Sequence, residues 1–342
     1  MTRRPRRWIR GTLAGVTLAG ALTAAALIAW HYSNHEIELA PPALPANVRP
    51  EESASISQVQ LDKDGLALPK KLGSLRFAVM GDTGRGDSAQ YDTANEMARW
   101  RQKFDFSFVL MMGDNIYATG TAENYAARFE RPYKALLDKG VVFYAVLGNH
   151  DPPDQWHYVP FNMNGNRYYS FTKDEGALPL ATHHVQFFAL DTVRLDSGQL
   201  DWLRRELGRS TADWKICFYH HPLYTSGRYR SSAFWTRSKL EPIFLQDGVD
   251  VGLNGHEHFY ERSVLRGGVQ YFTSGAGGAL RKNDITPSST MAAGFDADNH
   301  FMLMEISGDT LYFQAISRTG MTVDSGALKR GAHPPPSATL RK

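Results

Sequence analysis

The stretch FSFVLMMGDNIYATG, residues 106–120, joins a run of apolar residues to an abrupt polar turn. An apolar run of this length, rich in Phe and Val, favours a β-strand that is buried on both faces. Gly113 permits a sharp turn immediately before Asp114, because glycine has no Cβ. The stretch therefore predicts a strand that ends in a carboxylate, and it raises the question of why Tyr117 follows three residues later.

The same pattern recurs along the chain. Amphipathic segments lie between several of the apolar runs and predict helices, with Pro132 as the break in one of them. Buried runs that alternate with helices indicate a layered α/β architecture. Because the carboxyl ends of parallel strands share one edge of a sheet, their polar ends are predicted to meet. The further runs and their ends are LRFAVM–GDTG (75–84), VVFYAVL–GNHD (141–151), VQFFAL–DT (185–192), WKICFY–HHPLY (214–224), DVGL–NGHEH (250–258) and VQYFT–SGAGG (269–278).

The composition is that of a globular protein, with 42% hydrophobic and 21% charged residues. The chain has a formal net charge of +3, and the arginines that precede the first apolar run contribute more positive charge than this. The rest of the chain is close to neutral, so the sequence does not predict a basic surface that would bind nucleic acid. A single cysteine, Cys217, excludes an intramolecular disulfide, and its apolar neighbours favour a small buried side chain.

The N-terminal segment GTLAGVTLAGALTAAALIAW, residues 11–30, carries no charge over about the length that spans a bilayer. Because basic residues precede it, the rest of the chain is predicted to lie outside the cytoplasm. Residues 1–30 are therefore predicted to form a transmembrane anchor, while a cleaved signal that releases a secreted protein stays open. Residues 31–73 predict a proline-containing tether, 74–330 the folded domain and 331–342 a disordered tail.

The predicted strand ends supply an unusual number of carboxylates and imidazoles. Such groups are poor core material unless bound cations neutralise them, and a pair of metal ions would do so. Asp114 has two oxygens and can bridge two ions, imidazoles suit zinc or iron, and the Asn149 carboxamide suits a harder ion. His256 and His258 point the same way if the chain between them is extended. The residues concerned are Asp82, Asp114, Tyr117, Asn149, His150, Asp151, His220, His221, His256, Glu257 and His258.

Together the elements GDTG, GDNIY, GNHD, HHPLY and GHEH resemble those of the calcineurin-like metallophosphoesterases, and more narrowly of the purple acid phosphatases. The resemblance spans roughly residues 75–325, and GDNIYATG favours the small, single-domain, tartrate-resistant type. It implies a layered sandwich of two mixed β-sheets flanked by α-helices. It also implies a hydrolase that acts on phosphorylated small molecules. The tether is too short for the additional β-sandwich domain of the larger plant enzymes.

The resemblance also implies two metal sites. Fe(III) would be held by Asp82, Asp114, Tyr117 and His258, and Fe(II), zinc or manganese by Asp114, Asn149, His220 and His256. A tyrosinate is a hard anionic donor that stabilises Fe(III), and a trivalent ion lowers the pKa of bound water further than a divalent ion does. This explains why a tyrosine follows Asp114, although packing of the ring against the site stays an alternative.

In this reading a metal-bound hydroxide attacks a phosphate monoester, as in an acid phosphatase. His150 is the candidate to stabilise the developing charge or to protonate the leaving alcohol. Asp151 would orient His150 or cap the following turn. A phosphodiesterase or pyrophosphatase that acts on nucleotide or lipid substrates is the alternative enzyme. A phosphate-binding module without catalysis is the alternative outside enzymes.

One region departs from the family pattern. A second histidine that is not a ligand often follows the H-x-P histidine by about ten residues, but this chain has TSGRYRSS there. Arg228 and Arg230 in this segment could bind a phosphate oxygen in a bidentate manner. His221, next to a predicted ligand, is expected to form a hydrogen bond within the site. SGAGG near Ser274 could line the phosphate pocket or form an ordinary glycine-rich turn.

Overall fold

A computed structural model of the chain describes residues 56–175 and 183–331. The predicted membrane segment, residues 1–55 as a whole and the tail from residue 332 lie outside the described residues. Within the described part, no helix combines the length and the apolar character that crossing a bilayer requires. The predicted domain begins at residue 74, but part of the segment 56–73, which was predicted as tether, also packs against it. Leu66 and Leu68 are buried there, and the Ala67 N–H donates to Oε1 of Gln314 at 2.9 Å.

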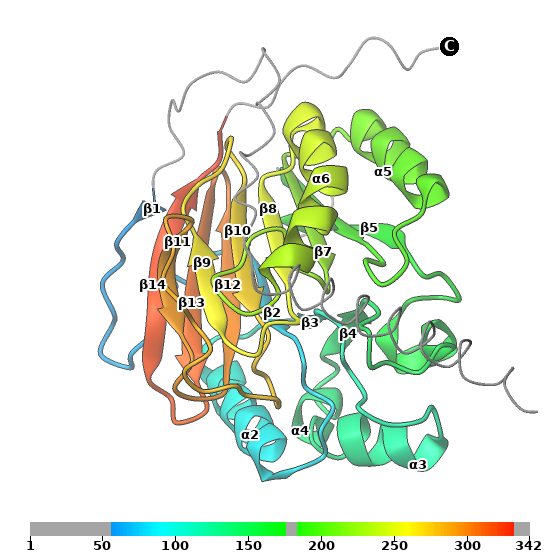
Figure 1. Cartoon of the computed structure of the whole chain (residues 1–342). Helices are drawn as coiled ribbons and strands as arrows, with labels where there is room; N and C mark the ends of the chain where they lie inside the picture. Colours follow the sequence, from blue (N-terminus) through cyan, green and yellow to red (C-terminus); the bar gives the residue numbers. More distant parts are fainter. Residues whose placement is uncertain (1–55, 176–182, 332–342) are drawn as a thin grey trace, which may run out of the picture. The chain divides into compact units, whose positions relative to one another are not determined.

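Two seven-stranded mixed β-sheets form the domain (Figure 1). In the first sheet β2, β3 and β4 are parallel neighbours, and β12, β13, β14 and β1 continue it in antiparallel order. The strands, in their order across the sheet, are β1 (Ile56–Ser57), β14 (Thr322–Lys329), β13 (Thr310–Ser317), β12 (His300–Ser307), β2 (Leu75–Met80), β3 (Phe108–Met111) and β4 (Val142–Ala145).

The second sheet has four parallel strands, β6, β7, β8 and β10, and antiparallel strands at its edges. Both sheets are therefore mixed, in agreement with the predicted fold class. The strands, in their order across the sheet, are β11 (Met291–Phe295), β9 (Tyr260–Ser263), β10 (Gln270–Ser274), β8 (Val251–Asn254), β7 (Trp214–Tyr219), β6 (His183–Ala189) and β5 (Tyr169–Glu175).

An apolar core fills the space between the two sheets. Alternate residues of β2, Phe77 and Val79, belong to this core, where the rings of Phe77 and Phe187 meet edge to face at 5.4 Å. The intervening residues, Ala78 and Met80, belong to a second cluster beneath the helices. Because both faces of these strands are covered, the strands are apolar at almost every position.

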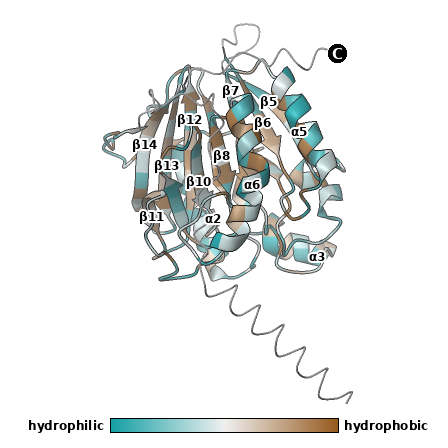
Figure 2. Ribbon diagram, turned by 45° about the horizontal axis from the view of Figure 1, so that its top comes forward, coloured by the Kyte–Doolittle hydropathy of each residue, from teal (hydrophilic) through white to brown (hydrophobic). Residues whose placement is uncertain are grey.

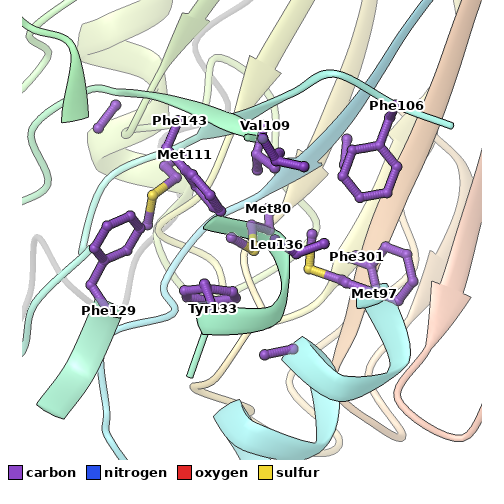
Figure 3. Close-up of a cluster of buried hydrophobic side chains, with 14 of the residues drawn as sticks. Met80, Met97, Phe106, Val109, Met111, Phe129, Tyr133, Leu136, Phe143 and Phe301 are labelled. Atoms are coloured by element: carbon purple, nitrogen blue, oxygen red, sulfur yellow. The ribbon is translucent and has the colours of Figure 1, made fainter. Parts of the chain in front are cut away.

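Helices cover the outer faces of both sheets. On the first sheet lie α2 (Ser88–Lys103) and α4 (Lys134–Leu137), which follows α3 (Ala122–Tyr125) and the π-helical turn Ala126–Glu130. Figure 3 shows Met97, Tyr133 and Leu136 of this layer packed around Met80 and Met111 of the strands. On the second sheet lie α5 (Ser197–Arg209) and α6 (Arg230–Asp247). In Figure 2 the helices carry teal, white and brown residues in turn, whereas inner strands such as β8 are mainly brown.

Candidate metal centre

Five loops that follow parallel strands of both sheets meet at one place. They are the GDTG, GDNIY and GNHD loops after β2, β3 and β4, and the HHPLY and NGHEH loops after β7 and β8. The loops bind one another through their backbones. The Asp82 N–H donates to the Gly113 carbonyl at 2.9 Å, and the Gly255 N–H donates to the His220 carbonyl at 3.1 Å. Polar strand ends thus converge as the sequence predicts.

Three candidate ligands form a first donor cluster. The Tyr117 hydroxyl lies 3.3 Å from Oδ1 of Asp82 and 3.2 Å from Nε2 of His258. His258 Nε2 in turn lies 3.3 Å from the same Asp82 oxygen. Oxygen donors together with an imidazole nitrogen, drawn from three different loops, suit an iron ion.

Four candidate ligands form a second cluster around Nε2 of His220. This nitrogen lies 3.0 Å from Oδ1 of Asn149, 3.1 Å from Nδ1 of His256 and 3.5 Å from Oδ1 of Asp114. The other ring nitrogen of His220, Nδ1, lies 2.8 Å from the carbonyl oxygen of Met112. A proton on Nδ1 satisfies that carbonyl, and it leaves the lone pair of Nε2 for a metal ion.

Backbone strain marks three of these ligands. Asp82, Asp114 and His256 have φ values of 55°, 51° and 70°, in the left-handed region that residues with a Cβ avoid. Such residues cost about 1–3 kcal/mol each and cluster at functional sites. Close packing adds a second constraint, since a Cβ on Gly148 would lie 2.1 Å from the backbone nitrogen of Asp114. The loops are therefore built to bring their side chains together.

The glycine-rich turn SGAGG and the residue after it form backbone hydrogen bonds with the Asp82 loop. The N–H groups of Gly278 and Ala279 donate to the Asp82 carbonyl at 3.1 Å and 2.9 Å. A Cβ on Gly275 would lie 2.2 Å from the Glu257 carbonyl oxygen and 2.8 Å from Oδ2 of Asp82. These contacts give the turn a structural role beside a candidate ligand.

Burial disfavours the charged forms of the candidate ligands unless a cation is bound beside them. Burial raises the pKa of Asp82 well above its ordinary value, and the nearby Asp114 carboxylate raises it further. Burial likewise raises the pKa of Asp114 and lowers that of His220 well below its usual range. It also lowers the pKa of His258 to about 3. Neutral imidazoles beside two buried carboxyl groups are the donor set that a pair of metal ions requires.

His150 and Asp151 differ in what they contact. The His150 side chain is exposed, its ring lies 5.1 Å from that of Tyr117, and its N–H donates to Oδ1 of Asp114 at 2.9 Å. Asp151 accepts hydrogen bonds from the Gly148 N–H at 2.8 Å and the Ile116 N–H at 2.9 Å. Asp151 therefore ties the loop after β4 to the loop after β3, a role that the sequence analysis did not consider.

The two arginines of the TSGRYRSS segment have other partners. Arg228 is exposed and binds both oxygens of Asp284, with Nε at 2.9 Å from Oδ1 and 3.0 Å from Oδ2. Arg230 donates to the carbonyl oxygens of Ser226 and Thr286 at 3.3 Å and 2.9 Å. Neither set of contacts favours the predicted binding of a phosphate oxygen. The sequence did not reveal the Arg228–Asp284 pairing, because the loop that carries Asp284 lies 56 residues further along the chain.

Sequence reasoning missed Arg281 and Tyr229. Nη2 of Arg281 lies 3.4 Å from Nε2 of His258, and the Tyr229 ring packs on that of His256 at 4.2 Å. Arg281 stands three residues after the SGAGG turn, in a segment without helix or strand, and no motif of the sequence marks it. The backbone N–H of His221 donates to Thr192 Oγ1 at 2.9 Å, and the same hydroxyl lies 3.1 Å from Nδ1 of the His221 ring.

Comparison with known proteins gives this architecture a family. Residues 75–260 match the calcineurin-like phosphoesterase family, so the chain belongs to it and is a hydrolase. Among its relatives, human tartrate-resistant acid phosphatase type 5 is 26% identical over 302 residues, which cover 76% of this chain and 93% of the relative. Purple acid phosphatase 17 of Arabidopsis thaliana is 29% identical over 253 residues, covering 64% and 72%. The resemblance to these phosphatases is thereby confirmed.

Solved structures share the fold at lower identity. The purple acid phosphatase PPD1 from yellow lupin seeds superposes with a TM-score of 0.58 at 16% identity, covering 81% of this chain and 59% of that one. GAP50, the anchor in the inner membrane complex of Plasmodium, superposes with a TM-score of 0.67 at 19% identity, covering 76% and 90%. At these identities the likeness concerns the fold alone.

Proposed function

We propose that this protein hydrolyses phosphate monoesters at a centre of two metal ions, in the manner of an acid phosphatase. The observation that carries the proposal is the pair of donor clusters. In the first, the donor atoms of Asp82, Tyr117 and His258 lie within 3.3 Å of one another, and in the second, three donor atoms lie within 3.5 Å of Nε2 of His220. Both clusters combine carboxylate oxygen with imidazole nitrogen. Relatives named acid phosphatases support the choice of a phosphate monoester.

The proposal assigns Fe(III) to Asp82, Asp114, Tyr117 and His258. It assigns a divalent ion, Fe(II), zinc or manganese, to Asp114, Asn149, His220 and His256. Bound there, the two ions would supply Lewis acidity toward the phosphoryl group and would activate water as the nucleophile. Tyr117 favours iron in the first position, because a phenolate is a hard anionic donor.

The protein's own residues would position the substrate and move a proton. His150 suits this role because its side chain is exposed while its backbone N–H is held by Asp114. From that position the imidazole can stabilise the charge that develops on the leaving oxygen, or protonate it. Asp151 is a positioning residue in this proposal, since it holds the loop that carries both Asn149 and His150.

Two other activities are compatible with parts of this arrangement. The same two ions could serve a phosphodiesterase or pyrophosphatase, because both reactions use a clamped phosphoryl group. A phosphate-binding module without catalysis is the second possibility, and GAP50 shows that a protein with this fold can be named for an anchor role. The complete set of seven candidate ligands favours catalysis.

The test uses the purified full chain with aryl phosphate monoesters and diesters side by side, over acid to neutral pH. We expect turnover of the monoester to exceed that of the diester. Asp114→Asn should lower kcat/KM by about 10³-fold or more while the protein stays folded, as loss of an essential catalytic group does. Asp154→Asn, at an exposed position, is the matched control and should keep full activity. Undiminished turnover in Asp114→Asn would contradict the proposal.

The placement of the enzyme outside the cytoplasm also remains a proposal, because it depends on residues 1–30. We expect the full chain to partition with membranes and a chain begun after Trp30 to remain in the supernatant. If both chains partition alike, the N-terminal segment does not anchor the enzyme.

A further inference from the structure

Arg281 brings a guanidinium group to the edge of the candidate metal centre. Its backbone N–H donates to the His258 carbonyl at 3.1 Å, so the side chain starts beside a candidate ligand. Nη2 of Arg281 then lies 3.4 Å from Nε2 of His258 and 3.3 Å from the Tyr229 hydroxyl. The Arg281 side chain is 21% exposed, which leaves part of it accessible to a ligand.

Glu257 and Tyr229 hold this guanidinium in place. Glu257 is fully buried, and its Oε1 accepts hydrogen bonds from Thr225 Oγ1 and from the Tyr229 N–H, both at 2.9 Å. Its second oxygen, Oε2, lies 3.7 Å from Nη1 of Arg281. The guanidinium carbon also lies 5.1 Å from the centre of the Tyr229 ring, within the range of a cation–π contact. A buried carboxylate and an aromatic face thus orient the charge of Arg281.

The position of Nη2 conflicts with metal binding unless an anion is present. Nε2 of His258 is the atom that a metal ion would use, and Nη2 of Arg281 lies 3.4 Å from it. Once a cation takes the lone pair of Nε2, the guanidinium loses an acceptor and faces a like charge. Nη2 would then keep the Tyr229 hydroxyl at 3.3 Å, a neutral acceptor, whereas a charged donor binds an anionic acceptor more strongly. An anionic oxygen at the same place would satisfy the donor and separate the charges.

We propose that Arg281, with the Tyr229 hydroxyl beside it, binds a phosphoryl oxygen of the substrate. This inference rests on the proposed function and identifies the group that recognises the phosphate. A guanidinium remains charged at every working pH and donates hydrogen bonds, but it does not act as an acid. Its contribution is therefore to substrate binding, and proton transfer is left to His150.

The direct test is equilibrium titration of the metal-loaded full chain with inorganic phosphate. Arg281→Gln should weaken phosphate binding by about 10- to 100-fold, the effect of losing one charge-assisted hydrogen-bonding group. KM for a monoester should rise by a similar factor, with a smaller change in kcat. Arg262→Gln is the matched control, because Arg262 is also largely buried and pairs with a carboxylate, Asp324, at 2.7 Å. This control should bind phosphate as the parent does.

A second variant guards against misfolding. Arg281→Gln leaves Glu257 buried without its partner, so the double variant Arg281→Gln/Glu257→Gln removes both charges together. It should fold and show the same weakened phosphate binding. Parent-like phosphate affinity and KM in either folded variant would overturn the role of Arg281.

Failure of the inference can be told from failure of the proposed function. A parent enzyme that turns over monoesters, with an Arg281→Gln variant that binds phosphate equally well, overturns the inference alone. A parent that binds phosphate through Arg281 but never turns over any ester supports the inference and overturns the proposed function.

Discussion

The phenolic oxygen of Tyr117 lies 3.2 Å from Nε2 of His258, although the two residues follow strands of different sheets. Tyr117 comes after β3 of the first sheet and His258 after β8 of the second. Asp82, after β2, brings Oδ1 within 3.3 Å of both atoms. A metal ion held by these three side chains would therefore bind the edges of the two sheets to each other.

Gly275 should be intolerant of any side chain. A Cβ there would lie 2.2 Å from the Glu257 carbonyl oxygen and 2.8 Å from Oδ2 of Asp82, so Gly275→Ala must displace the Asp82 loop. We expect the free energy of unfolding to fall by about 1–3 kcal/mol, as overpacked sites do, and metal content to fall with it. Gly331→Ala, where a Cβ meets nothing within 4 Å, is the control. Urea unfolding measures the stability and elemental analysis measures the metal content. If both equal the parent's values in Gly275→Ala, the packing argument is wrong.

Asp151 should stabilise the site through two loops at once. Its Oδ1 and Oδ2 accept the N–H groups of Ile116 and Gly148, and in Asp151→Asn one of these acceptors becomes an NH₂ donor. A buried N–H without an acceptor costs about 1–3 kcal/mol, so unfolding should need less urea. Metal affinity should also fall, because Gly148 precedes the candidate ligand Asn149. Asp154→Asn, at an exposed position nearby, should leave both quantities unchanged. If Asp151→Asn is as stable as Asp154→Asn, then Asp151 does not stabilise the two loops.

His300 should make the fold sensitive to acid. This side chain is fully buried at the start of β12, and burial lowers its pKa to about 3. In the unfolded chain its pKa is about 6.5, so below that pH the unfolded state binds a proton that the folded state does not. Stability should therefore be lost as the pH falls from about 6.5 toward about 3. The contribution is about 1.4 kcal/mol per pH unit, or about 2 kcal/mol between pH 7 and pH 5.

His300→Leu tests this dependence, because leucine has a similar volume and no titrating group. The variant should lose about 2 kcal/mol less than the parent when urea unfolding is repeated at pH 5 instead of pH 7. The comparison cancels the ionisation of all other groups. Identical losses in the two proteins would mean that His300 does not govern acid stability.

Much of the parallel framework could be predicted from the sequence. The runs LRFAVM and WKICFY coincide with β2 and β7, because strands buried on both faces leave a continuous apolar signature. The break at Pro132 also occurs, between the π-helical turn and α4. The antiparallel strands β12, β13 and β14 were not anticipated. Strand β14, for example, is partly exposed over TVDS and buried over GAL, so it has neither a continuous apolar run nor a clear alternation.

The candidate site divides in a similar way. Residues within three positions of a strand end, such as Asp114 and His220, could be placed because topology alone brings strand ends together. Arg281 could not be placed, because its position depends on a hydrogen bond to the His258 carbonyl across 23 residues of chain. The pairing of Arg228 with Asp284 was not predicted for the same reason, since Asp284 lies 56 residues further on. Side chains in long loops are positioned by tertiary contacts that sequence spacing does not reveal.

The central claim is that Tyr117 and its neighbours hold an iron ion in a centre of two metals. Its most direct test is the metal content and visible spectrum of the purified full chain, compared with Tyr117→Phe. The account predicts two metal ions for each chain, at least one of them iron, and a visible charge-transfer band that is lost in Tyr117→Phe. A colourless, active protein that holds two zinc or manganese ions, with a Tyr117→Phe variant of unchanged metal content, would contradict it.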